Sequence, residues 1–147
     1  MTELIEVTIG ARPWLPSEDA VAIAEFDRFN FPTTGLIRQG SRLYLFDCVD
    51  GHAMEGNVWV YVQVSDQGAE TLRRLTGREL IDGVDRAFQG RPLMGVLAIG
   101  GRVRSGAPVS EQAVADKGLG QALLDELQHG RQVAAKAATD LQHLVSA

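Results

Sequence analysis

The sequence has few of the residues that carry thiol and metal chemistry. Its 147 residues include one cysteine, Cys48, and three histidines, His52, His129 and His143. A single cysteine cannot form an internal disulfide, which fits a reducing compartment, and no two histidines have the i, i+4 spacing of a helical zinc site. We therefore expect a cytoplasmic protein with no metal centre and no cofactor.

Long apolar runs are also missing. No hydrophobic stretch approaches the roughly 20 residues that a transmembrane helix needs. Acidic residues stand near the first methionine, where a signal peptide needs positive charge. The lack of a long apolar run and of a positively charged N-terminus argues against interaction with a membrane.

Basic residues are outnumbered, 14 against 19 acidic ones, for a net charge of −5. A chain of this charge is not built to neutralise phosphates, which argues against general nucleic-acid binding. Residues 73–104 are the local exception, because seven arginines there outnumber three acids. This stretch is either a solvated helix face of mixed charge, which the pattern favours, or a local anion-binding site.

The composition that remains is that of one ordinary globular domain spanning residues 1–147. Hydrophobic residues make up 45% of the chain and charged residues 22%. The strongest strand signal covers 57–65, where four valines alternate with Trp59, Tyr61 and two polar residues. Further strands are predicted over 3–9, 34–39, 42–48 and 93–104, with a hairpin connection between the second and third.

Helical signals occupy the rest of the chain. Ser17 is predicted to cap a short helix over 18–26, and one bent helix or two short ones are expected between 66 and 89. Residues 110–144 are helical in character, with a heptad-like seam whose centre is small. The predicted fold is α+β: an antiparallel four- to five-stranded meander, helices on one face and a long C-terminal helical segment. We expect that segment to pack on the sheet or to pair in a homodimer.

The segment 26–35 is the most distinctive in the chain, since it holds three of the five phenylalanines beside charged and polar residues. Aromatic side chains interleaved with arginine and asparagine are typical of interface hot spots, and equally of a loop that plugs an open sheet face. The candidate binding residues are Phe26, Asp27, Arg28, Phe29, Asn30, Phe31, Arg38, Trp59 and Tyr61.

The glycine-containing stretch Lys117–Leu124 resembles the pyrophosphate loop of the GCN5-type N-acetyltransferase family. That resemblance implies backbone N–H groups that bind the pyrophosphate of acetyl-CoA. The chain departs from the family pattern at Ala115, where the family has glutamine or arginine, and no strand-like segment follows residue 120.

Two functions stay open. The first is a non-catalytic binding or regulatory module, of accessory or immunity type, that recognises a protein partner through its aromatic surface. No catalytic set is recognisable, which favours this reading. The alternative is a small-molecule-binding domain or small enzyme, with Asp27, Arg28, Asn30 and Arg38 around a pocket beside the meander, an acyl-CoA-dependent acyltransferase among the possibilities.

Overall fold

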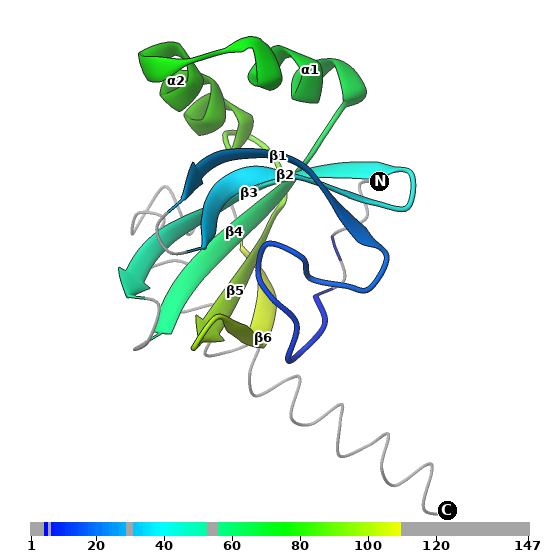
Figure 1. Ribbon diagram of the computed structural model, residues 1–147, viewed down its shortest axis with the longest axis vertical. Helices are drawn as coiled ribbons and strands as arrows, with labels where there is room; N and C mark the ends of the chain where they lie inside the picture. Colours follow the sequence, from blue (N-terminus) through cyan, green and yellow to red (C-terminus); the bar gives the residue numbers. More distant parts are fainter. Residues whose placement is uncertain (1–4, 6, 29–30, 53–55, 110–147) are drawn as a thin grey trace, which may run out of the picture.

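The computed structural model describes residues 5, 7–28, 31–52 and 56–109, with their side chains except at 50–52. The predicted C-terminal helical segment, its homodimer seam and the acetyltransferase-like stretch lie outside these residues. Within them the fold is α+β, with six strands and two short helices (Figure 1). The elements are β1 Ala20–Arg28, β2 Pro32–Gln39, β3 Arg42–His52, β4 Gly56–Val64, α1 Asp66–Arg74, α2 Gly77–Ala87, β5 Leu93–Ile99 and β6 Arg102–Val109.

The strands form one antiparallel meander in the order β1-β2-β3-β4-β5-β6. The predicted hairpin is confirmed, because Gln39 pairs with Arg42 across the turn between β2 and β3. Both helices are inserted between β4 and β5, which remain neighbours in the sheet. Figure 1 shows the two helices together on one side of the sheet.

The predicted strand over 93–104 is in fact two strands, which raises the total to six. Gly100 and Gly101 have φ angles of +61° and +75°. Positive φ at both central residues is what a two-residue type I′ hairpin turn requires, and glycine adopts it without strain. The chain therefore turns back at this point, and β6 continues to Val109 instead of ending at residue 104.

The predicted helix over 18–26 is wrong, because this segment is the edge strand β1. Ser17 does not cap a helix; its hydroxyl donates to Asp19 Oδ1 at 2.6 Å, and its carbonyl accepts from Ala20 N in a turn. Main-chain pairing with β2 then extends the segment, while Ile23 packs toward the core. Tertiary pairing has overridden the helix propensity of three alanines.

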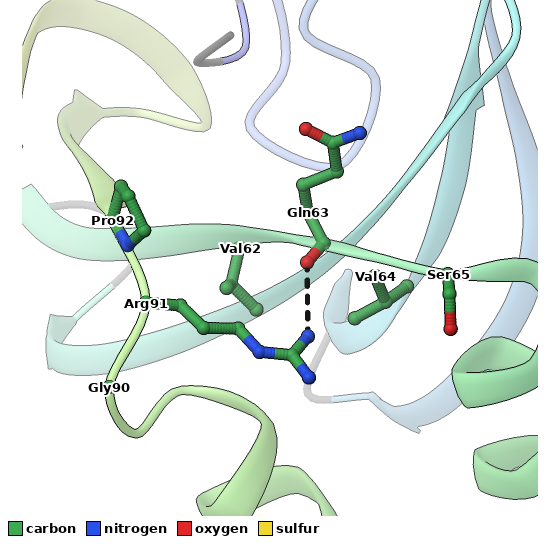
Figure 2. Close-up of a pocket in the computed structure, with 7 residues that line it drawn as sticks. All are labelled: Val62, Gln63, Val64, Ser65, Gly90, Arg91 and Pro92. Atoms are coloured by element: carbon green, nitrogen blue, oxygen red, sulfur yellow. Dashed lines mark hydrogen bonds between the residues drawn. The ribbon is translucent and has the colours of Figure 1, made fainter. Parts of the chain in front are cut away.

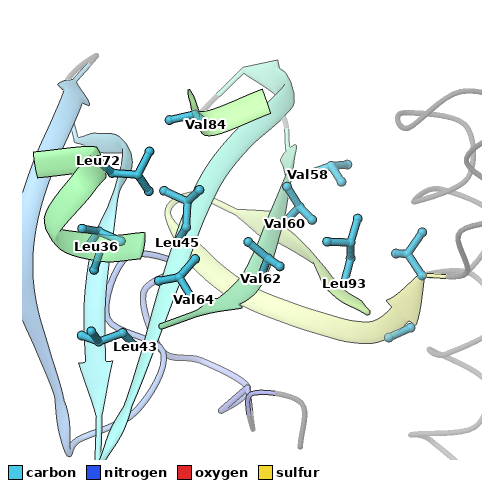
Figure 3. Close-up of a cluster of buried hydrophobic side chains, with 13 residues drawn as sticks. Leu36, Leu43, Leu45, Val58, Val60, Val62, Val64, Leu72, Val84 and Leu93 are labelled. Atoms are coloured by element: carbon cyan, nitrogen blue, oxygen red, sulfur yellow. The ribbon is translucent and has the colours of Figure 1, made fainter. Parts of the chain in front are cut away.

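The alternation predicted for 57–65 is confirmed, because the two faces of β4 enter two different hydrophobic clusters. Figure 3 shows the β4 valines in a row with leucines of β2 and β3, and with Leu72 and Val84 of the helices above them. Trp59 and Tyr61 belong to the cluster on the opposite face. The sheet is thus a central layer with apolar packing on both sides.

The N-terminal segment covers this second face. Of the strand predicted over 3–9, Ile5 and residues 7–9 are described, and none of them lies in a strand. Ile5 is instead buried in the cluster of Trp59. The segment is tied to β6 by Val103, which accepts from Gly10 N at 2.7 Å and donates to Ala11 O at 2.7 Å.

Candidate functional site

The structure separates the predicted binding residues into different places. Trp59 and Tyr61 are buried, with exposed fractions of 0% and 1%. Trp59 Nε1 donates to Asn57 Oδ1 at 2.6 Å, and the Tyr61 hydroxyl donates to the carbonyl oxygen of Pro13. Burial raises the pKa of the Tyr61 phenol. These two aromatics hold the N-terminal segment on the sheet and present no surface to a partner.

Phe31 belongs to the same face. Its ring stacks on Trp14 with centroids 5.1 Å apart and planes within 10°, and it lies tilted against Trp59 at 5.7 Å. It is half-buried. Of the two functions that the sequence allows for this loop, closing the sheet face is the one that Phe31 performs in the described structure.

The remaining predicted residues lie on β1 and β2. Arg28 is exposed and pairs with Glu25 at 2.6 Å, and Arg38 lies 3.7 Å from Asp66 at the start of α1. Phe29 and Asn30 lie outside the described residues. Arg28 and Arg38 therefore each have an acidic neighbour already, and neither provides an unpaired charge for a ligand.

Phe26 and Asp27 are the two predicted residues that reach a substantial cavity. It has a volume of about 370 Å³ and lies where the sheet meets α2. We call this cavity the acidic groove. The residues that line it are Phe26, Asp27, Thr34, Asp47, Gly77, Leu80, Ile81, Val84 and Asp85.

Apolar side chains from the sheet and from α2 line much of this groove. Phe26 and Leu80 are half-buried and pack against the helix-side cluster, to which Val84 belongs. Ile81, by contrast, is 58% exposed. It is one of five large hydrophobic residues that are exposed in the described part of the chain, and among these it is the one that lines the groove.

Three carboxylates give the groove its charge, one each from β1, β3 and α2. Asp47, from β3, accepts a hydrogen bond from the Thr34 hydroxyl at 2.6 Å. Burial raises the pKa of Asp47 to about 6, against the opposing effect of the Thr34 hydrogen bond, and the negative charges of Asp85 and Asp27 raise it further. At neutral pH this carboxylate is mostly ionised, in a position where a cation would relieve repulsion.

The groove is suited to holding a cation that carries an apolar group. Its lining contains no histidine, cysteine or serine, and the one hydroxyl group in it, that of Thr34, donates to Asp47. Among the described residues, no three acidic, histidine or cysteine side chains are grouped closely enough to hold a metal ion. The arrangement therefore fits an organic cation, such as a lysine or arginine side chain, better than a bare ion.

Sequence reasoning missed most of the groove, although two signals for it were present. The hairpin turn that pairs Gln39 with Arg42 also sets Thr34 opposite Asp47. Ile81 and Asp85 are four residues apart, a spacing that puts both on one face of a helix. Neither signal says that residues of α2 lie over Asp47, in the middle of β3, and this arrangement is what creates the cavity.

Comparison of the chain with protein-family models, with curated proteins and with solved structures finds no match. No helix within the described ranges is long and apolar enough to cross a membrane.

Proposed function

We propose that this protein is a non-catalytic binding module that recognises a protein partner through the acidic groove. The partner inserts a basic side chain beside a large apolar one. The basic group pairs with Asp27, Asp47 and Asp85, and the apolar group covers Ile81 and Phe26. This moves the recognition surface from the buried face of Trp59 to the opposite side of the sheet.

The observation that carries the proposal is the exposure of Ile81 beside uncompensated carboxylates. An isoleucine with 58% of its surface in water gains free energy when a partner covers it. The groove lining contains three acids and no basic residue, so an incoming cation meets no competing side chain within it. Complementary charge of this kind speeds association and selects among partners.

A peptide selection tests the proposal directly. A random twelve-residue library is displayed and selected separately on the wild-type protein, on Ile81→Ser and on Val21→Ser. Val21 is the matched control, because it is also an exposed aliphatic residue, at 57%, but lies on β1 away from the groove lining.

We expect the wild type and Val21→Ser to enrich the same peptides, each pairing lysine or arginine with a large apolar residue. The Ile81→Ser protein should bind those peptides about tenfold more weakly or worse, because the contact loses most of an aliphatic side chain's burial. Equal binding by Ile81→Ser, or enrichment of peptides without a basic residue, would refute the proposal, as would the absence of any enriched peptide.

A further inference from the structure

Two cavities lie at the junction between β4 and α1 and at the segment that connects α2 to β5. Each has a volume of about 490 Å³, and Val64, Ser65 and Arg91 line both of them. Neither shares a residue with the acidic groove. We treat them together as the arginine pocket, defined by Ser65, Thr71, Leu72, Leu75, Arg86 and Arg91.

The arginines of the two helices fall into two groups. Arg73 and Arg74 pair with Glu70 at 3.8 and 3.3 Å, and Arg78 pairs with Asp82 at 3.3 Å. These three form the solvated face of mixed charge that the sequence favours. Each of the three already has a carboxylate neighbour, so they offer less to a ligand than an arginine without one.

Arg86 and Arg91 form the second group, because each is held by a main-chain carbonyl and has no carboxylate partner among the described residues. Arg86 Nε donates to the carbonyl of Asp82 at 3.4 Å, and Arg91 Nη1 donates to the carbonyl of Gln63 at 3.2 Å. Figure 2 shows Arg91 extending from the segment before β5 across Val62 to β4. These contacts limit the positions of both guanidinium groups and leave other N–H groups free to donate.

The lining of the arginine pocket contains no aspartate or glutamate, although the whole chain carries a net charge of −5. Its other polar residues are neutral. The Ser65 oxygen accepts from Gly68 N at 2.9 Å as the N-cap of α1, which leaves its hydroxyl hydrogen available to donate. Leu72 and Leu75 supply an apolar wall beside these donors.

We propose that the arginine pocket binds a small organic oxyanion, a molecule with a phosphate or carboxylate group on an apolar body. Arg86 and Arg91 hold the oxyanion, since a guanidinium donates paired hydrogen bonds to either group. The Ser65 hydroxyl adds a donor, and the apolar body packs against Leu72 and Leu75. This site goes beyond the proposed protein-binding function and does not depend on it.

Binding of defined probes by the full chain tests the site. Inorganic phosphate, phenyl phosphate and benzoate are titrated calorimetrically at constant ionic strength. They are added to the wild type, Arg86→Gln and Arg91→Gln. Arg74→Gln and Arg78→Gln are matched controls on α1 and α2, because both arginines are already ion-paired. Comparison of the affinities for phenyl phosphate and benzoate shows whether the pocket binds a phosphate or a carboxylate.

We expect at least one aromatic probe to bind the wild type and both controls about tenfold more tightly than inorganic phosphate. Arg86→Gln and Arg91→Gln should each weaken that probe about tenfold or more. Arg86 and Arg91 are exposed, so the glutamine variants should melt like the wild type. If a glutamine variant melts at a lower temperature than the wild type, the lysine variant at the same position replaces it in the test. Lysine keeps the positive charge but lacks the paired N–H donors of a guanidinium, so it should retain part of the affinity.

Failure of all three probes to bind the wild type would overturn the inference. So would equal binding by the glutamine variants, or an equal loss in the two controls, which would indicate a diffuse charge effect.

Discussion

At the scale of single residues, Asp47 is the most informative position. Its carboxyl combines partial burial, a hydrogen bond from Thr34 and two acidic neighbours, and the net result is a pKa of about 6. The raised value means that the folded protein binds this proton more tightly than the unfolded chain does. An ionised Asp47 therefore destabilises the fold while it strengthens the field that a bound cation would experience.

Replacing Asp47 with asparagine should remove the loss of folding stability that the ionised carboxylate causes. Stability of the wild type relative to Asp47→Asn is expected to fall as pH rises from about 4 through 6 and to level off near pH 7, because the pKa is raised from 3.8 to about 6. With allowance for partial exposure, the gain of the variant at pH 7 is on the order of 1–2 kcal/mol. Urea unfolding at a series of pH values measures it; a difference that does not change with pH contradicts the account.

The sequence makes part of this residue's role predictable. The two-residue turn of the β2–β3 hairpin sets Thr34 opposite Asp47, and this register follows from the turn position alone. The burial of Asp47 does not follow from it, because burial depends on where α2 crosses the sheet. In the sequence, Asp47 and Asp50 look like acids that flank a turn, where acids commonly sit for backbone reasons, so neither indicates a functional site.

At the scale of elements, the sheet and its two covers explain what the aromatic residues do. The β4 alternation was predictable because valines and aromatics recur with a period of two. The N-terminal segment that packs over Trp59 and Tyr61 was not predictable, because a strand pattern does not indicate which segment packs on the second face of the strand. The β-branched N-terminal segment supplies that cover from irregular structure, where it looked like a strand in the sequence.

Tyr61→Phe tests this role of the N-terminal segment. The variant leaves the Pro13 carbonyl buried without its donor, and we expect a loss of about 1–2 kcal/mol in the free energy of unfolding. Tyr44→Phe is the matched control, because Tyr44 is 4% exposed in the same cluster and its hydroxyl makes no hydrogen bond to the described residues that the substitution would remove. Denaturant melts of both variants provide the comparison. Equal stability of the two would mean that the segment is not held through Tyr61.

At the scale of the whole molecule, acidic and basic side chains line separate cavities: acids line the acidic groove and arginines line the arginine pocket. Residues 1–65 hold nine acidic and four basic residues, and two of those acids line the acidic groove. The arginine-rich stretch supplies Arg86 and Arg91 to a pocket that contains no acid. Charge counting reveals this asymmetry from the sequence. Which arginines are already neutralised by ion pairs can be seen only from the helix contacts.

The central claim is that recognition takes place at the acidic groove and not on the aromatic face. Chemical-shift mapping with a library-selected peptide locates binding directly, through amide resonances and the Trp59 indole resonance. We predict shifts confined to Phe26, Asp47 and the Ile81–Asp85 turn of α2, with the Trp59 indole unchanged. A shifted Trp59 indole with α2 unaffected would place the partner on the opposite face and contradict the account.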